Sequence, residues 1–264
     1  IYGRISNKLA KAPAFRRWLF QAAVSVGWHQ FERKQGRRRW HPKLLFHRLL
    51  HRLVADKIHQ LLGGRMRFAI SGGAALSPEI AHTFLGLGVP ILQGYGLTET
   101  SPVISCNLPG DNDPASVGVP LTGVEVRIGP DHEVQVNSPG IMLGYWNNHK
   151  ATAEMIGRDG WLNTGDQGYL KNNHIYINGR IKDILVLSNG EKVPPADMEM
   201  AIALDPLFEQ VMVIGEGRSW LAALIVLNEE LWPEFAREHG VDPENSESLS
   251  DKHVVTAAMN RITT

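Results

Sequence analysis

The spacing of apolar residues predicts a helical first region. Residues 1–62 are read as helical, and between His41 and Leu62 apolar side chains recur every four residues. The apolar rows are Leu45, Leu49, Leu53 and Phe46, Leu50, Val54, Ile58, Leu62, and the polar rows are His47, His51, His59 and Arg48, Arg52, Asp56, Gln60. This alternation predicts one amphipathic helix whose apolar rows face the core and whose histidine row faces water.

A strand, a helix and a second strand are predicted after Gly63-Gly64. Apolar runs at Met66–Ile70 and Val89–Leu92 indicate short buried strands, and Ser77-Pro78 starts a helix that ends near Gly86 or Gly88. A strand, a helix and a second strand that follow one another so closely favour a parallel pairing of the two strands. The glycine-containing segments 72–75 and 94–96 are then expected as loops at one sheet edge, where open α/β sheets bind ligands.

The remaining elements are short. Between residues 117 and 180 the predicted antiparallel strands are Val124–Ile128, Glu133–Val136 and His174–Ile177. In the tail, strands are predicted at Ile184–Leu187, Val211–Ile214 and Leu221–Leu227, and helices at Pro195–Leu204 and Glu229–His239. We therefore expect an α/β protein with a large domain over 1–180 and a small α+β domain over 181–264. The large domain divides into a basic helical part (1–62), an α/β unit (63–116) and a β subdomain (117–180).

Composition indicates a globular protein. The chain has 264 residues, 43% of them hydrophobic, with 27 Lys and Arg against 27 Asp and Glu. One cysteine, Cys106, excludes an intrachain disulfide and suits a reducing cytoplasm. The apolar stretch Trp18–Val26 is too short to span a bilayer.

The balanced charge hides an uneven distribution. Residues 1–65 carry 15 Lys and Arg against Glu32 and Asp56, so this segment has a charge of +13 and the rest of the chain −13. A solvated basic face is the first interpretation, and contact with an anionic membrane is the second. No nucleic-acid partner is expected, because no recognised binding signature accompanies the basic residues.

The run Gln93-Gly94-Tyr95-Gly96-Leu97-Thr98-Glu99-Thr100 carries the strongest chemical signal. Glycines on both sides of an aromatic ring allow a ligand to approach the backbone while the ring offers a stacking face. Thr98 and Glu99 add a hydroxyl and a carboxylate, which suit a phosphate and its Mg²⁺. A plain surface turn is the alternative.

Two later runs add candidate polar groups. Trp161-Leu162-Asn163-Thr164-Gly165-Asp166 places a carboxylate after a tight turn, where it could accept hydrogen bonds from vicinal hydroxyls or bond its own backbone. Gly179-Arg180-Ile181-Lys182-Asp183 precedes the tail and offers an arginine to a sugar or phosphate, unless it is an ordinary charged linker.

Together with Ser71-Gly72-Gly73-Ala74-Ala75, these runs resemble the adenylate-forming, AMP-binding superfamily in order and spacing from about Arg65 onward. The Gly144-Tyr145-Trp146 segment with Asn147, and Leu187-Ser188-Asn189-Gly190-Glu191-Lys192-Val193, are most similar to long-chain fatty acid:CoA ligases. The resemblance implies an acid–thiol ligase that uses ATP, Mg²⁺, a fatty acid and coenzyme A. It implies two steps, formation of acyl-AMP with release of pyrophosphate and then transfer of the acyl group to coenzyme A with release of AMP.

The resemblance also implies a role for individual residues. Adenine would be surrounded by Gly73, Ala74, Ala75, Gly94, Tyr95 and Gly96. In catalysis, Thr98 would act at the phosphate and Glu99 at Mg²⁺. The ribose would be bound by Asp166 and Arg180, and a hinge would be formed by Lys182 and Asp183. Lys252 does not fit the family's adenylation lysine, and nothing between Ile1 and Arg65 matches its phosphate loop. We therefore expect a ligase truncated at both ends that does not complete the ligation alone.

Two alternatives stay open at this stage. A fatty acyl-AMP ligase or carrier-loading adenylation enzyme would use the same residues, and a non-catalytic basic module that binds membranes belongs to another class. The expected location is the cytoplasm, with or without peripheral attachment to the inner face of the membrane. Acyl chain length, the thiol acceptor and the oligomeric state are not encoded in these motifs.

Overall fold

The computed structural model describes residues 2–10 and 12–262, which form two compact units. Lys8–Lys182 make up one unit, and the chain from Asp183 onward groups with the first residues, up to Asn7, in the other. The first helix, α1 (Tyr2–Ala10), crosses that boundary. Within the described residues no helix is both long and apolar enough to cross a bilayer.

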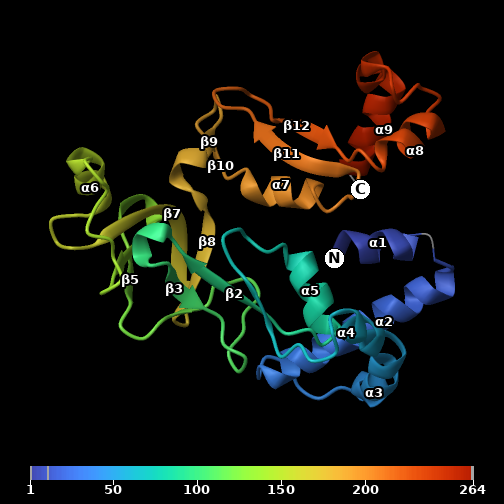
Figure 1. The fold of residues 1–264 in the computed structure, drawn as a ribbon, viewed down its shortest axis with the longest axis horizontal. Helices are drawn as coiled ribbons and strands as arrows, with labels where there is room; N and C mark the ends of the chain where they lie inside the picture. Colours follow the sequence, from blue (N-terminus) through green and yellow to red (C-terminus); the bar gives the residue numbers. More distant parts are fainter. Residues whose placement is uncertain (1, 11, 263–264) are drawn as a thin grey trace. The chain divides into compact units, whose positions relative to one another are not determined.

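The larger unit contains a four-stranded sheet with the strand order β1-β2-β3-β4, of which β2 and β3 are labelled in Figure 1. Its strands are β1 (Ala69–Ser71), β2 (Ile91–Gly96), β3 (Val103–Cys106) and β4 (Val119–Pro120). The pair β1–β2 is parallel and is joined through α5 (Pro78–Gly86), which confirms the predicted strand–helix–strand unit. The other pairs are antiparallel.

Two details of this unit differ from the prediction. Residues 94–96 are strand rather than loop, because Gly94 and Tyr95 pair with Cys106 and Ser105 of β3. The predicted buried strand Met66–Ile70 is displaced toward Ser71, and the Ile70 side chain is 66% exposed on the unpaired edge of the sheet.

A second sheet, β5-β6-β7-β8, confirms the predicted antiparallel subdomain. Its strands are β5 (Glu125–Ile128), β6 (Glu133–Asn137), β7 (Leu162–Lys171) and β8 (His174–Arg180). The helix α6 (His149–Met155) precedes β7 in the chain. The larger unit also has the short 3-10 turns η3 (Thr98–Thr100) and η4 (Pro130–His132), and η5 (Ile181–Asp183) follows β8. The core that joins the two sheets is formed by the fully buried Ile104, Val134, Val136 and Ile175. Backbone hydrogen bonds of Ile175 with Val117 and Gly118 fasten β8 beside β4.

The basic region is helical, as predicted, but its apolar rows do not all face inward. It comprises α2 (Ala14–Lys34), η1 (Pro42–Phe46), α3 (His47–Leu50), a π-helical turn η2 (His51–Ala55) and α4 (Asp56–Leu61). Leu45, Leu49 and Leu53 are exposed, whereas Ala55 and Ile58 are buried. Since a π turn takes more residues per turn than an α-helix, it shifts the rows out of register along the segment.

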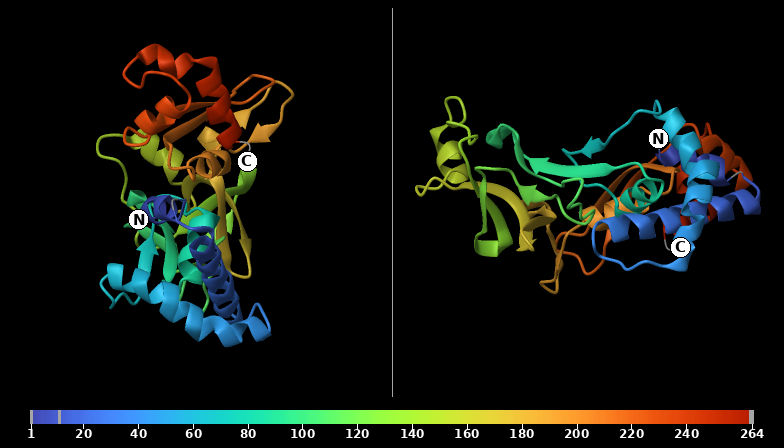
Figure 2. Two further views of the ribbon diagram at one scale, coloured as in Figure 1. Left: turned by 90° about the vertical axis from the view of Figure 1, so that its right-hand side faces the viewer. Right: turned by 90° about the horizontal axis from the view of Figure 1, so that it is seen from below.

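The predicted solvent-facing row His47, His51 and His59 is consequently half-buried rather than exposed to solvent. The ring nitrogen Nε2 of His59 lies 3.0 Å from the carbonyl oxygen of Leu87, and Nδ1 of His51 lies 2.9 Å from a carboxylate oxygen of Asp56. Figure 2 shows the long blue helix α2, which packs against α5.

From Asp183 onward, the described residues of the smaller unit form two hairpins, three α-helices and one 3-10 helix. The hairpins pair β9 (Leu185–Val186) with β10 (Lys192–Val193) and β11 (Phe208–Ile214) with β12 (Ala222–Leu227); the helical segments are α7 (Ala196–Ile202), α8 (Trp232–Glu238), η6 (Ser246–Ser250) and α9 (Lys252–Ile262). Leu207, Phe208, Phe235 and Val254 form its core. The predicted strands and helices of the tail are confirmed within a few residues, while β10, η6 and α9 lie outside the predicted elements.

Candidate active site

Three of the residues implicated by sequence meet within the larger unit. The Tyr95 hydroxyl donates a 2.6 Å hydrogen bond to Asp166 Oδ2, and Arg180 Nε lies 3.3 Å from Asp166 Oδ1. Tyr95 comes from β2, while Asp166 and Arg180 face each other as register partners on β7 and β8. The structure thus joins the Tyr95 ring to a carboxylate 71 positions later and a guanidinium 85 positions later in the sequence.

A local irregularity of β7 sets the position of Asp166. Pairing with β6 shifts between Asn163 and Gln167, and Gly165 adopts φ 73°, a conformation that favours glycine. The backbone N–H of Asp166 donates to the Thr164 hydroxyl at 3.1 Å. The bulge therefore fixes the carboxylate in a strand rather than in the free turn expected from sequence.

Electrostatics keep the Tyr95 hydroxyl protonated. Burial, followed by the adjacent Asp166 carboxylate, raises the pKa of Tyr95 well above its usual value. Asp166 is itself 5% exposed. Tyr95 therefore acts as a donor to the Asp166 carboxylate, and any ligand hydroxyl at Asp166 would share that carboxylate with Tyr95 and Arg180.

The glycine loop lies beside this cluster at the same edge of the sheet. Gly72 follows β1, and a β-carbon built on it would lie 3.3 Å from the carbonyl oxygen of Gly94, so the two backbones are close. Gly73 has φ 83°, and a β-carbon there would meet nothing within 4 Å. Residues 73–75 are exposed, which leaves their backbone groups accessible beside Tyr95.

Thr98 and Glu99 occupy the short turn η3. The buried Thr100 hydroxyl donates toward the carbonyl oxygens of Leu97 (2.9 Å) and Pro102 (2.7 Å), which fixes the corner. Thr98 is exposed. Glu99 Oε1 accepts a 2.7 Å hydrogen bond from the Tyr145 hydroxyl. That hydrogen bond is the main reason for the raised pKa of Tyr145.

The Glu99 carboxylate fits a metal that takes most of its ligands from elsewhere. Among the described residues no group of three His, Cys, Asp or Glu side chains is placed to hold a metal ion. Mg²⁺ commonly binds one or two protein carboxylates and completes its shell with substrate phosphates and water. A single half-exposed carboxylate beside an exposed threonine is consistent with that kind of site.

Lys182 and Asp183 lie in η5, directly after β8. The boundary between the two compact units falls between these two residues. The sequence does not predict the hydrogen bond between Tyr145 and Glu99, because nothing local in the Gly144-Tyr145-Trp146 segment indicates that the hydroxyl reaches this carboxylate.

A second buried polar cluster has the order of a Ser–His–Asp triad. The Ser116 hydroxyl lies 2.7 Å from His174 Nδ1, and His174 Nε2 lies 3.1 Å from Asp111 Oδ1. Ser116 is fully buried, and its hydroxyl also lies within hydrogen-bonding distance of the carbonyl oxygen of Asp113. Since no substrate can reach this oxygen, the cluster fastens loop 107–116 to β8.

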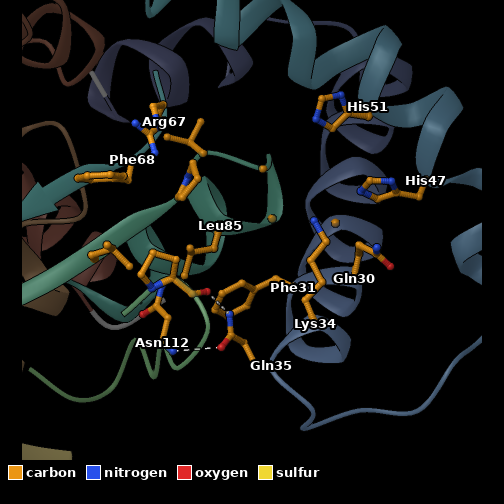
Figure 3. A pocket seen from close by; sticks show the side chains of 17 residues that line it. Gln30, Phe31, Lys34, Gln35, His47, His51, Arg67, Phe68, Leu85 and Asn112 are labelled. Atoms are coloured by element: carbon orange, nitrogen blue, oxygen red, sulfur yellow. Dashed lines mark hydrogen bonds between the residues drawn. The ribbon is translucent and has the colours of Figure 1, made fainter. Parts of the chain in front are cut away.

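A cavity of about 330 Å³ opens at the start of β1 and β2, the opposite end of these strands from the glycine loop. Figure 3 shows His47 and His51 on one side of it and Arg67 and Phe68 on the other. Burial, His51 and Lys34 lower the pKa of His47. The cavity lining includes none of the residues that the sequence motifs implicate among those described.

Comparisons with known proteins relate two regions of the chain to one enzyme family. Residues 38–146 match the family described as AMP-binding enzyme, and residues 182–258 match the AMP-binding enzyme C-terminal domain. The chain is 35% identical over 234 residues to the long-chain-fatty-acid–CoA ligase FadD15 of Mycobacterium bovis, covering 87% of this chain and 38% of that protein. It is 36% identical over 227 residues to the long-chain-fatty-acid–[acyl-carrier-protein] ligase AEE15 of Arabidopsis thaliana, covering 76% and 30% respectively.

A solved structure shares the fold. O-succinylbenzoate coenzyme A synthetase (MenE) from Bacillus subtilis, in complex with ATP and magnesium ion, matches with a TM-score of 0.55 and 28% identity, over 65% of this chain and 40% of that one. The chain thus spans well under half the length of these relatives. By its motifs, its fold and these relatives, the chain belongs to the adenylate-forming superfamily of AMP-binding enzymes.

Proposed function

We propose that this chain supplies the adenosine-binding part of an ATP-dependent long-chain fatty acid:CoA ligase. The observation that carries the proposal is the cluster in which Tyr95 and Arg180 both contact the Asp166 carboxylate, beside the open glycine loop. In the proposed complex the ring of Tyr95 stacks on adenine against the backbone of Gly73–Ala75 and Gly94–Gly96. The ribose hydroxyls donate to the Asp166 carboxylate, which Tyr95 and Arg180 also contact.

The proposed reaction forms a mixed anhydride and then a thioester. The fatty carboxylate attacks the α-phosphorus of ATP and expels pyrophosphate, and the thiolate of coenzyme A then attacks the acyl carbon and expels AMP. Because an anion approaches a polyanion in the first step, stabilisation of charge matters more than a general base. Thr98 would donate to a phosphate oxygen and Glu99 would hold the Mg²⁺, which would neutralise phosphate charge when bound.

Replacing Glu99 tests this assignment. Glu99→Ala in the full-length protein that carries this chain should lower the rate of pyrophosphate release by about a hundredfold or more, the usual scale for a lost charge-stabilising group. Glu125→Ala, which removes an exposed carboxylate of β5, is the matched control and should leave the rate unchanged. Near-normal pyrophosphate release from Glu99→Ala would refute the assigned role.

The acceptor of the acyl group is proposed to be coenzyme A. The relative from Mycobacterium bovis is named for coenzyme A and the one from Arabidopsis thaliana for an acyl carrier protein, at nearly equal identity. An assay that supplies each thiol in turn separates the two, and we expect thioester formation with coenzyme A. Turnover with a carrier protein alone would assign the chain to the other acceptor class.

Lys182 and Asp183 are proposed as the hinge between the two half-reactions. The support is that the compact units of the chain change between these residues. Stiffening this point with Lys182→Pro should slow thioester formation more than adenylate formation, measured as separate half-reactions. Equal slowing of both steps would argue against a hinge.

Peripheral binding to an anionic membrane is proposed as an accessory property. The exposed row Leu45, Leu49 and Leu53 lies beside Arg48 and Arg52, so apolar and basic side chains are presented together. Vesicles containing anionic lipid should co-sediment the protein at low salt and release it at high salt. Failure to bind vesicles at low salt would exclude this property and leave the enzymatic proposal untouched.

A further inference from the structure

Tyr145 occupies a defined place beside the Glu99 carboxylate. Its hydroxyl donates a 2.7 Å hydrogen bond to Oε1, across 46 positions of sequence. Among the described residues it is the one hydrogen-bond partner of this carboxylate, which leaves Oε2 available to another ligand. The loop that carries Tyr145 also contacts Glu99 through its backbone, because the Met142 N–H donates a 2.8 Å hydrogen bond to the Glu99 carbonyl oxygen.

The backbone of Tyr145 is held from the opposite side by the start of α6. Its N–H donates to the Thr152 hydroxyl at 2.9 Å, and its carbonyl oxygen accepts from the Asn148 N–H at 3.2 Å. Asn148 in turn caps α6 by accepting from the Ala151 N–H at 3.0 Å. These contacts present the phenol to Glu99 from a fixed backbone.

Gly144 is required for that arrangement. It has φ 146°, and a β-carbon on it would lie 2.8 Å from Thr152 Cγ2. The neighbouring Trp146 offers a contrast, because it is 91% exposed. The loop therefore directs one of two adjacent aromatic side chains to the turn η3 and leaves the other in solvent.

We propose that Tyr145 is a positioning residue that holds Glu99 so that Oε2 faces the metal; the inference rests on the proposed function of Glu99. A glutamate side chain loses rotamer freedom when it ligates a metal. Because the hydrogen bond from Tyr145 already restricts the Glu99 side chain, less rotamer freedom remains to be lost when the metal binds. Carboxylate ligands are typically hydrogen-bonded by such outer partners, whose removal weakens metal binding by about ten- to a hundredfold. Tyr145 is 37% exposed, so the lower end of that range applies.

The test measures how much Mg²⁺ strengthens ATP binding in the full-length protein that carries this chain. ATP affinity is determined with saturating Mg²⁺ and with a chelator, and AMP affinity serves as a metal-independent reference. Tyr145→Phe removes only the hydroxyl and should reduce the Mg²⁺-dependent gain about tenfold while AMP affinity stays unchanged. Trp146→Phe is the matched control for a conservative change in the same loop, and Glu99→Gln marks complete loss of the carboxylate.

A second variant separates positioning from a direct effect of the phenol. Thr152→Val keeps the Tyr145 hydroxyl but removes the hydroxyl that accepts from its backbone N–H, so it should reduce the Mg²⁺-dependent gain by less than Tyr145→Phe does. A Mg²⁺-dependent gain in Tyr145→Phe equal to that of the unmodified protein, with loss in Glu99→Gln, would overturn the inference and leave the proposed function intact. If Glu99→Gln also leaves the gain unchanged, Glu99 is no metal ligand, and the inference fails together with that part of the proposed function.

Discussion

The crossing of α2 and α5 gives the sharpest prediction for the fold. The two helices approach through Gly27 and Gly86: a β-carbon on Gly27 would lie 1.7 Å from the Gly86 carbonyl oxygen, and one on Gly86 would lie 2.5 Å from the Val24 carbonyl oxygen. Both obstacles are backbone atoms, which cannot rotate away. Gly27→Ala must therefore push the helices apart.

The size of the effect follows from that distance. An ordinary carbon–oxygen contact needs about 3.4 Å, so the two helices must separate by roughly 1.5 Å. A gap of about 1 Å already removes up to half of the dispersion energy of an atomic contact, so the side-chain contacts between the helices would lose more than that. Overpacking of this kind costs about 1–3 kcal/mol or more, and loosened burial of Val24, Phe84 and Leu85 adds to it. Alanine returns about 1 kcal/mol of helix propensity. Because the loosened burial roughly offsets this return, we expect a net loss of about 1–3 kcal/mol.

The assay is urea unfolding, with hydrogen exchange of α2 and α5 to locate the loss in the larger unit. Gly3→Ala in α1 is the matched control, because a β-carbon there meets nothing within 4 Å. That control should unfold within about 1 kcal/mol of the unmodified protein. A Gly27→Ala variant as stable as the control would refute the close helix crossing.

Two further predictions concern buried and half-buried histidines of the larger unit. His174→Ala removes one hydrogen-bond partner of the buried Ser116 hydroxyl and opens a cavity, so the free energy of unfolding should fall by about 3 kcal/mol. The exposed His149→Ala should cause no change, and equal urea midpoints for the two variants would contradict the role assigned to this network. Burial lowers the pKa of His47 and His82 below the ordinary value of 6.5, so the folded state disfavours their protonation. Stability should be complete above about pH 6.5 and decline as the pH falls through that value toward the lowered folded pKa. A His47→Gln, His82→Gln double variant should show a flatter decline between about pH 7 and 5, and parallel curves would contradict the burial of these rings.

The sequence could predict the elements whose signals are local. Ser77-Pro78 and the following apolar spacing place α5 correctly, and alternation between turn signals places β5, β6 and β8. The extension of β2 through Gly94 and Tyr95 could not be read in the same way. Glycine-rich sequence favours a loop, and pairing with β3, a later segment, overrides that preference.

The orientation of the histidine row failed for a similar reason. The π turn at His51–Ala55 has no clear local signature, yet it decides which side chains face α5 and which face solvent. Periodicity therefore predicted the helix but not its buried face.

Candidate site residues were recognisable because their motifs are contiguous, but their mutual contacts were not. Tyr95, Asp166 and Arg180 were each expected to touch a nucleotide, and nothing in the sequence indicated that the tyrosine hydroxyl donates to the carboxylate. The Tyr145 contact with Glu99 depends on a loop that returns to η3 after 46 positions. Such contacts arise from tertiary folding, and residue spacing alone does not specify them.

The central claim is that adenosine binds at the Tyr95–Asp166 cluster, and a crystal structure of the protein with AMP tests it most directly. We expect the adenine base against the Tyr95 ring beside the Gly73–Ala75 backbone and the ribose hydroxyls within hydrogen-bonding distance of Asp166. AMP bound instead in the cavity lined by Lys34 and Arg67, with Tyr95 and Asp166 untouched, would contradict the account.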